Sequence, residues 1–287
     1  MIHFFCTFVF NINYTQMKKL FLLFLTISAI VIACKTVPIT GRSQFNVVPD
    51  SQILPMSFAQ YEGFLKENKI STNASQTKQI KDVGSRISKA VDRYMRTNGM
   101  TAEADAYRWE FNLVQDTTIN AWCMPGGKIV VYSGILPVTK DDAGLATVMG
   151  HEVSHALANH GAQRMSASQL QQLGAVGVAV ATGSKSAEQQ QMWQQYYGLG
   201  SEVGVMLPFS RNHESEADKI GLTLMAIAGY NPELAISFWE RMSASSSGNK
   251  PPEFLSTHPA DATRIANLRK LIPEAKAEAL KFGVMFK

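Results

Sequence analysis

Cysteine is scarce in this sequence, which has three in 287 residues, at positions 6, 34 and 123. Cys6 and Cys34 lie in an N-terminal region with features of its own, so Cys123 is the only cysteine in the rest of the chain. A single cysteine cannot form an intramolecular disulfide, which excludes a disulfide-stapled scaffold. We therefore expect the core alone to stabilise the fold, and we interpret Cys123 as a packing residue rather than a nucleophile.

A strong excess of charge of one sign is also missing. Lys and Arg number 27 and Asp and Glu 23, the formal net charge is +4, and the basic residues are scattered. Scattered basic residues form no continuous positive surface, which argues against nucleic-acid binding. An apolar content of 46% and a charged content of 17% are those of a globular protein rather than a disordered one. The length allows one sizeable catalytic domain or two small ones.

The sequence has no hydrophobic run of the length that crosses a membrane. Its main apolar run, Leu20 to Ala33, has 14 residues, and a spanning helix requires about 20. This run lies within "MKKLFLLFLTISAIVIAC", Met17 to Cys34, which has the layout of a secretory signal. Because "VIAC" is similar to the lipobox of bacterial lipoproteins, we predict lipidation of Cys34; an uncleaved anchor, or a plain signal with a chance cysteine, is the alternative. Residues 1–16 have no role in this scheme, and we infer that translation begins at Met17.

Three parts of the chain are distinguished by composition. They are a signal with its lipobox over 1–34, a tether and lead-in over 35–57, and a catalytic domain over 58–287. We expect helices over 56–68 and 76–95, and strands over 107–116, 119–124 and 128–134, the last two joined by the turn "PGG". The sequence predicts an α+β domain, mainly helical, with a small antiparallel sheet.

A further helix contains the stretch "GHEVSHALANHG", Gly150 to Gly161. We expect this helix to begin in the capping-box-like "TKDD" at 139–142 and to stop at Gly161, where glycine can adopt the left-handed conformation. Residues 166–210 form an insertion rich in Ser, Gln, Gly and Ala, and its run "LGAVGVAVA" is interpreted as a helix or a lid over the site. Later helices are expected in "SRNHESEADKIGLTLMAIAGYNP", in "PELAISFWERM" and at the C-terminus.

Two histidines and a glutamate interrupt the otherwise apolar helix. His151 and His155 are four residues apart, so their side chains share one helical face and can converge on one metal ion. Glu152 lies beside them and can accept a proton from water at the metal, which is the chemistry of an H-E-x-x-H motif. Ionisable groups in a buried helix need compensation, which a divalent cation supplies. The alternative is a pair of hydrogen-bonded core histidines with an ion-paired glutamate.

A zinc hydrolase needs a third protein ligand and one open coordination position. His160 is nine residues from His151, which is half a revolution on a continuous helix, so we exclude it as a ligand. Glu214 is the better candidate. Asp218 lies one turn further along the same face, where it can accept the free N–H of a ligating imidazole.

The neighbours of these two acids support a close approach of the two helices. Ala217 and Gly221 keep the stripe beside Glu214 and Asp218 small, so this helix can pack tightly against the histidine helix. The alternative is a solvated acidic face, and we assign that role to Glu216.

Three segments carry a resemblance to a known family. "HEVSHALANHGAQRMS", "YGLGSEVGVMLPFSRNHESEADKIGL" and "STHPADATRI" resemble the zinc metallopeptidase family that contains HtpX, LoiP, BepA and the CAAX prenyl proteases, over roughly residues 40 to 272. The resemblance implies a gluzincin-like fold with one Zn²⁺ per chain, held by His151, His155 and Glu214, with Asp218 in support. It also implies a position near the metal for His258, where this residue can block or assist.

The resemblance extends to substrate binding and to Arg264. "NAWCMPGGKIVVYSG" resembles the family's edge-strand segment, so Asn120 and Ala121 would present backbone groups to a peptide substrate; a plain hairpin is the alternative. Arg264 lies in the third of the segments quoted above, "STHPADATRI", and the resemblance implies a role for it as well. The chain lacks the several hydrophobic spans of the prenyl-protease branch and the repeats of BepA, so it is most similar to the lipid-anchored envelope members.

The function expected from these observations is that of a zinc-dependent metalloendopeptidase of the bacterial cell envelope. A lipid on Cys34 would anchor it to a membrane, its catalytic domain would be periplasmic, and its substrates would be misfolded or misassembled envelope proteins. Glu152 would act as general base, and His258 would stabilise the oxyanion or latch the open position. One alternative is a non-enzymatic, chaperone-like lipoprotein with structural zinc, which a permanent fourth ligand such as His258 would favour. A second alternative, an intramembrane prenyl-type protease, is disfavoured by the single short apolar segment.

Overall fold

The computed structural model describes residues 34–46, 48–245, 252–260 and 262–286. The signal predicted before Cys34 and the start at Met17 lie outside the described residues. Cys34 begins the first strand, but the lipidation predicted for its side chain also lies outside what is described. Among the described residues, no helix combines the length and hydropathy that a bilayer span requires.

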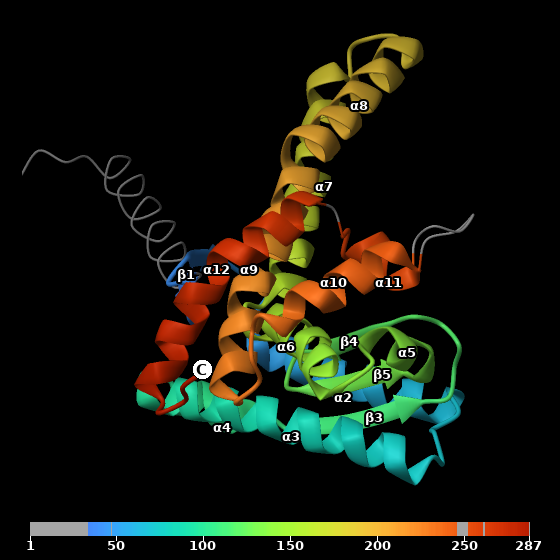
Figure 1. Ribbon diagram of the computed structural model, residues 1–287. Coiled ribbons are helices and arrows are strands. Elements are labelled where there is room, and N and C mark those ends of the chain that lie inside the picture. Colours follow the sequence, from blue (N-terminus) through green and yellow to red (C-terminus); the bar gives the residue numbers. More distant parts are fainter. Residues whose placement is uncertain (1–33, 47, 246–251, 261, 287) are drawn as a thin grey trace, which may run out of the picture.

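Helices dominate the described chain and surround a small sheet (Figure 1). The helices are α2 Asp50–Glu67, α3 Ala74–Thr97, α4 Thr101–Ala106, α5 Leu136–Thr139, α6 Asp142–Leu157, α7 His160–Thr182, α8 Ala187–Ser201, α9 Leu207–Ile227, α10 Leu234–Ala244, α11 Glu253–Thr257 and α12 Ala262–Lys281. The strands are β1 Cys34–Thr36, β2 Ser43–Phe45, β3 Glu110–Val114, β4 Ala121–Met124 and β5 Lys128–Tyr132. The predicted mainly helical α+β class is confirmed.

The three-stranded sheet is mixed, so the prediction of an antiparallel sheet was wrong in this detail. Strand order is β3-β5-β4, with β4 antiparallel to β5 and β3 parallel to β5. The expected hairpin at "PGG" joins β4 to β5, and β5 then inserts between the other two strands. Its residues Ile129, Val130 and Val131 are all fully buried, which favours the central position for this strand.

The N-terminal part of the described chain is more structured than a tether. β1 and β2 form an antiparallel pair, here called the N-terminal arm, residues 34–45. Helix α2 begins at Asp50 rather than at the predicted residue 56, and it contains Pro55. Pro55 is the sixth residue of α2, past the first turn, so its missing N–H leaves out one intrahelical hydrogen bond, to the carbonyl of Ser51. The helix predicted over 76–95 is confirmed as α3.

The helix with the histidine pair ends earlier than predicted. α6 begins after Asp141, whose side chain accepts a hydrogen bond from the backbone N–H of Gly144, and it ends at Leu157. Asn159 adopts the left-handed conformation, with φ of 55°, and α7 begins at the next residue. Gly161, predicted to be the stop, lies within α7. Asn tolerates the left-handed region better than most residues do, so the chain turns at Asn159 instead.

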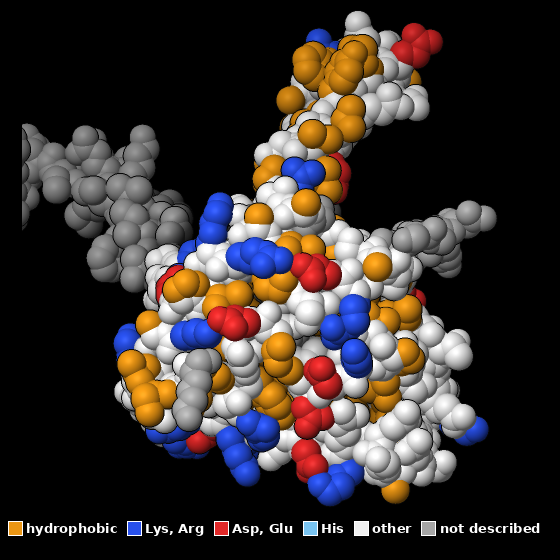
Figure 2. Space-filling model, in the orientation of Figure 1, with side chains coloured by type: hydrophobic (Ala, Val, Ile, Leu, Met, Phe, Trp, Pro, Cys, Tyr) orange, Lys and Arg blue, Asp and Glu red, His pale blue; other side chains and the backbone are white. Residues whose placement is uncertain are grey.

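The insertion at 166–210 forms a helical hairpin, α7 and α8, that projects from the rest of the molecule (Figure 1). Its run "LGAVGVAVA" is helical, as one of the two interpretations expected. Side-chain hydrogen bonds to the backbone join the two helices, from Tyr197 Oη to Gln171 O at 2.9 Å and from Gln194 Nε2 to Ala175 O at 2.9 Å. Apolar side chains are exposed along this hairpin (Figure 2), among them Leu173 and Val180.

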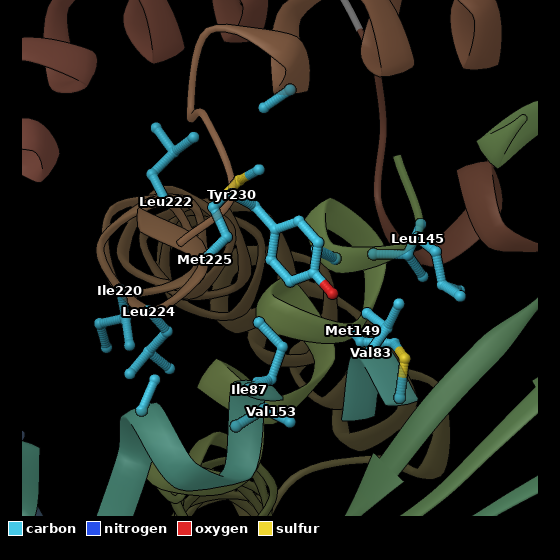
Figure 3. Close-up of a cluster of buried hydrophobic side chains, with 14 of the residues drawn as sticks. Val83, Ile87, Leu145, Met149, Val153, Ile220, Leu222, Leu224, Met225 and Tyr230 are labelled. Carbon is cyan, nitrogen blue, oxygen red and sulfur yellow. The ribbon is translucent and has the colours of Figure 1, made fainter. Parts of the chain in front are cut away.

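The core is formed around α6, which packs against α9, α3, α10 and strand β4. Residues 143–157 of α6 are all buried, which confirms the prediction of a helix buried on every side. Side chains from α3, α6 and α9 interdigitate in the centre of this core (Figure 3), among them Val83, Ile87, Leu145, Met149, Val153, Ile220, Leu224 and Met225. The close packing of α6 on α9 sets the separation of the two helices that carry the predicted ligands.

Candidate metal centre

Four side chains from three segments converge beside α6. They are His151 and His155 from α6, Glu214 from α9, and His258, which directly follows α11. One ligand atom from each lies within 4.8 Å of every other. The structure thus brings together the three predicted ligands and His258, the residue for which the resemblance implies a position near the metal.

The spacing of these atoms fits a tetrahedral zinc site. Ligands at about 2.0–2.1 Å from a zinc ion lie roughly 3.3 Å from one another. His155 Nε2 is 3.1 Å from His151 Nε2, and Glu214 Oε1 is 3.3 Å from His155 Nε2. His258 Nδ1 is 3.1 Å from His151 Nε2 and 2.8 Å from Glu214 Oε2. Two nitrogens and a carboxylate form the ligand set of many catalytic zinc sites.

The second nitrogen of His151 binds a carboxylate, as predicted. His151 Nδ1 is 3.0 Å from Asp218 Oδ1, so we assign the ring proton to Nδ1, which leaves a lone pair on Nε2 facing the cluster. Arg264 holds Asp218 with two hydrogen bonds, of 2.8 Å from Nε and 2.7 Å from Nη2, and stacks 3.6 Å above the ring of Trp239. Burial opposes ionisation of Asp218, but Arg264 and His151 lower its pKa.

The second nitrogen of His155 binds His160. The two Nδ1 atoms are 2.9 Å apart, and His160 Nε2 is 3.0 Å from Glu216 Oε2. His160 is outside the ligand cluster, as predicted, but the reason given from a continuous helix was wrong because the helix breaks at Asn159. The prediction that Glu216 is solvated was also wrong, since its side chain is 8% exposed.

These assignments show why the cluster needs a cation. His151 and His155 each direct a lone pair into the same space, and the Glu214 carboxylate lies against both. Burial opposes ionisation of Glu214, but the imidazoles of His151, His155 and His258 that face its oxygens hold its pKa well below the usual range. Buried lone pairs and a buried anion repel one another unless a positive charge lies between them. A divalent cation satisfies all of these groups.

Glu152 lies beside the cluster rather than in it. It is 4% exposed, and its Oε1 has no hydrogen-bond partner among the described residues; His258 Nε2 lies 3.4 Å from this oxygen. Burial raises the pKa of Glu152, and His258 and His151 offset this rise in part. A carboxylate with a raised pKa is well suited to take and return a proton near neutral pH.

The segment that carries His258 is attached to the edge of the sheet. The backbone N–H of Phe254 in α11 donates to Ile119 O at 3.1 Å, and Asn120 Nδ2 donates to Glu253 Oε1 at 2.9 Å. Asn120 thereby contacts α11. Its carbonyl accepts a hydrogen bond from the N–H of Tyr132 at 3.1 Å, so this carbonyl points into the sheet.

Strand β4 is terminal in its sheet and packs next to α6. Backbone groups of successive residues in an antiparallel strand point alternately towards the partner strand and away from it. Because Asn120 bonds to Tyr132, the backbone groups of Ala121 and Cys123 point to the open edge. The N–H of Ala121 donates a hydrogen bond to the side chain of its neighbour, Asn120 Oδ1, at 2.9 Å.

Comparisons with known proteins agree with this site. The model of peptidase family M48 matches residues 77–272, which include all four residues of the cluster. The chain belongs to peptidase family M48. M48 peptidases use zinc, and the cluster is positioned to bind it.

Several curated M48 relatives are metalloendopeptidases by name. Mitochondrial metalloendopeptidase OMA1 of Schizosaccharomyces pombe is 36% identical over 193 residues, which is 67% of this chain and 54% of that protein. OMA1 of Bos taurus is 30% identical over 245 residues, 83% of this chain and 46% of that protein. The beta-barrel assembly-enhancing protease of Yersinia pestis is 32% identical over 207 residues, 67% of this chain and 42% of that protein. The chain thus spans about half the length of the curated relatives it matches.

Three residues near the M48 site were not predicted from the sequence. His160, Glu216 and Arg42 form a chain of contacts behind His155 that is buried at His160 and Glu216 and exposed at Arg42. The sequence did contain a signal for His160. Asn159 tolerates the left-handed conformation and can end a helix, which places His160 in a new helix. Nothing in the sequence indicates the contact of Arg42 with Glu216, which are 174 positions apart.

Proposed function

We propose that this M48 chain is a zinc-dependent metalloendopeptidase in which His151, His155 and Glu214 hold the metal and Glu152 is the general base. The observation that supports this most directly is the convergence of a His-His-Glu set beside a buried carboxylate with a raised pKa. Asp218 is proposed to orient His151 through Nδ1, and Arg264 to hold Asp218 in place.

The chemistry divides between the metal and the protein. When bound, zinc polarises the scissile carbonyl and lowers the pKa of water at the site towards about 7. Glu152 takes a proton from the water whose oxygen attacks the carbonyl carbon. As the C–N bond breaks, the same carboxyl group delivers that proton to the departing amine nitrogen. Exclusion of bulk water from Glu152 keeps this proton within the site.

His258 is proposed to act as a latch. Its Nδ1 lies among the ligand atoms and its Nε2 lies 3.4 Å from Glu152, so it fills the position that water and substrate need. Attack on a peptide then requires this ring to withdraw, together with α11. The rival function, a non-enzymatic protein with a permanently closed structural zinc, is favoured by the same observation, because structural sites have four protein ligands.

The substrate is proposed to be an extended peptide that adds to the open edge of β4. The outward backbone groups of Ala121 and Cys123 would pair with it, and the adjacency of β4 to α6 would bring its scissile bond to the cluster. Movement of Asn120 away from Glu253 would release α11 and free the N-terminal end of this edge.

The location is proposed to be the bacterial cell envelope, with the protein anchored by a lipid on Cys34 and its catalytic domain in the periplasm. The secretory layout and the lipobox-like "VIAC" support this proposal. The name of the Yersinia pestis relative supports misfolded or misassembled envelope proteins as substrates. Other relatives are mitochondrial, so the envelope location rests on the N-terminal sequence.

The test is peptide cleavage by the purified protein. We expect the zinc-loaded protein to cleave casein, a chelator to abolish cleavage, and added zinc to restore it. Glu152→Gln is the matched control, because it keeps the ligands and removes the base. Zinc binding without cleavage, in both the parent protein and a His258→Ala variant, would instead establish the structural role.

A further inference from the structure

The two histidines of the H-E-x-x-H motif are supported differently on their far sides. His151 binds a carboxylate directly, through Asp218, whereas His155 reaches a carboxylate only through a second imidazole. His160, this second imidazole, is fully buried. Each nitrogen of a buried imidazole needs a hydrogen-bond partner. The donor and acceptor roles of the two His160 nitrogens can therefore be assigned from its neighbours.

The hydrogen bonds behind His155 have one consistent direction. His155 presents Nε2 to the ligand cluster, so its Nδ1 carries the proton and donates to Nδ1 of His160. His160 Nδ1 is then an acceptor, so its proton is on Nε2, which donates to Glu216 Oε2 at 3.0 Å. Because the Glu216 carboxylate only accepts, it fixes the proton of His160 on Nε2 and, through it, the proton of His155 on Nδ1.

Glu216 is in turn held by the N-terminal arm. Arg42 donates from Nη2 to Glu216 Oε2 at 2.6 Å and from Nε to Oε1 at 3.0 Å, and Thr40 Oγ1 donates to Oε1 at 2.6 Å. Arg42 and Thr40 thus occupy both carboxylate oxygens of Glu216 and hold it in the orientation in which it faces His160.

We propose that His160 and Glu216 are positioning residues for the zinc ligand His155, and that Arg42 and Thr40 of the N-terminal arm are part of that support. The hydrogen-bonded pair of His160 and Glu216, here called the relay, keeps His155 in the tautomer with a free Nε2 and restrains its ring. Both effects increase the affinity of His155 for the metal. The proposal rests on His155 being a zinc ligand. It goes beyond that role because it makes metal affinity depend on the N-terminal arm. The arm lies about 110 residues before His155 in the sequence and contacts the relay at Glu216.

A purely structural role for this network is the competing explanation. Gln163 cross-links it, since its Nε2 donates to Gln44 Oε1 at 2.7 Å and its Oε1 accepts from Arg42 Nη2 at 3.0 Å. His213 stacks on His160 with ring centroids 4.0 Å apart. If the network served packing alone, its loss would lower the stability of the metal-free protein. Zinc affinity would then fall only to the extent that the variant misfolds.

The experiment measures zinc affinity and metal-free stability on the same full-chain variants. Zn²⁺ affinity is determined by competition with a chelating dye at constant pH, Co²⁺-substituted protein is examined by visible absorption, and unfolding of the metal-free protein is followed by circular dichroism. The variants are His160→Leu, His160→Gln, Glu216→Gln and Arg42→Gln. Lys219→Gln is the matched control, because Lys219 is also on α9 and in an ion pair, 2.6 Å from Glu274, with no contact to the relay.

We expect His160→Leu to weaken zinc binding by about 10- to 100-fold and to change the cobalt spectrum. His160→Gln should restore much of the affinity, because its amide oxygen can accept from His155 Nδ1. Glu216→Gln and Arg42→Gln should weaken binding in the same direction and progressively less, with Lys219→Gln at the parent value. Arg42 is partly exposed, so its variant should fold even if His160→Leu does not.

Two results would overturn the inference. One is parent-like zinc affinity and cobalt spectra in Glu216→Gln and Arg42→Gln; the other is equal losses in His160→Leu and His160→Gln that scale with loss of metal-free stability. Failure of the parent protein to bind zinc would instead refute the proposed function. The two failures are therefore distinguishable.

Discussion

Gly150 on α6 and Gly221 on α9 face each other with no side chain between them. A Cβ on Gly150 would lie 3.0 Å from the carbonyl oxygen of Gly221, and a Cβ on Gly221 would lie 3.0 Å from the backbone nitrogen of His151. The helices that carry the zinc ligands therefore meet backbone to backbone. This contact confirms the small stripe predicted beside Glu214 and sets how far its carboxylate lies from the two histidines.

Gly221→Val should destabilise the protein and weaken zinc binding. The branched side chain would press on the backbone of His151, which cannot move aside as a flexible side chain could, and we expect a loss of about 1–3 kcal/mol. Urea unfolding of the metal-free protein measures the loss, and chelator competition measures zinc affinity. Gly177→Ala in α7 is the control, since nothing lies within 4 Å of a Cβ there. Unchanged stability in Gly221→Val would contradict the tight contact.

Glu152→Gln should keep zinc and lose proteolysis. The amide has nearly the shape of the carboxyl group but cannot take a proton, and we expect cleavage to fall by about 10²- to 10⁴-fold. Metal content of the purified variant and its rate of casein cleavage check both parts. A fully active variant would remove Glu152 from the role of general base.

Glu214→Ala should lose both zinc and proteolysis. Its carboxylate oxygens lie 3.3 Å from His151 Nε2 and 3.3 Å from His155 Nε2, so the variant leaves two histidines without their anionic partner. Metal analysis after dialysis is the deciding measurement, with Glu274→Ala, an exposed acid paired with Lys219, as the control. Zinc retained at one ion per chain would show that the third ligand is another residue.

His258→Ala should raise the rate of peptide cleavage. The variant keeps His151, His155 and Glu214 and removes the ring that fills the fourth position. Initial rates on a fluorogenic peptide, divided by zinc content, compare it with the parent protein. A large fall in that normalised rate, with zinc retained, would mean that His258 assists the reaction instead of blocking it.

Cys123 should react slowly with iodoacetamide in the folded protein. Burial raises the pKa of its thiol well above the ordinary value, so at about pH 8 less of it is the reactive thiolate than in an unfolded chain. Raising the pH towards the higher pKa should narrow the difference. Peptide mass spectrometry in buffer and in urea gives both rates for the same residue. Equal rates would contradict the interpretation of Cys123 as a packing residue.

The sequence alone determined those features that depend on local geometry. Residues four apart on a helix share a face whatever surrounds them, so the pairing of His151 with His155 and of Glu214 with Asp218 could be predicted from spacing. The burial of α6 on all sides could be predicted in the same way, because a helix that is apolar all round has no polar face to expose to solvent. The mainly helical class follows from the same periodicity.

Tertiary packing decided the rest. The parallel pairing of β3 with β5 and the burial of Glu216 were each predicted differently, because each depends on which distant segment packs against it. The approach of His258 to the ligands and of Arg42 to Glu216 joins residues 107 and 174 positions apart. No periodicity in a sequence encodes contacts across such separations, since they form only when the helices have packed around one core.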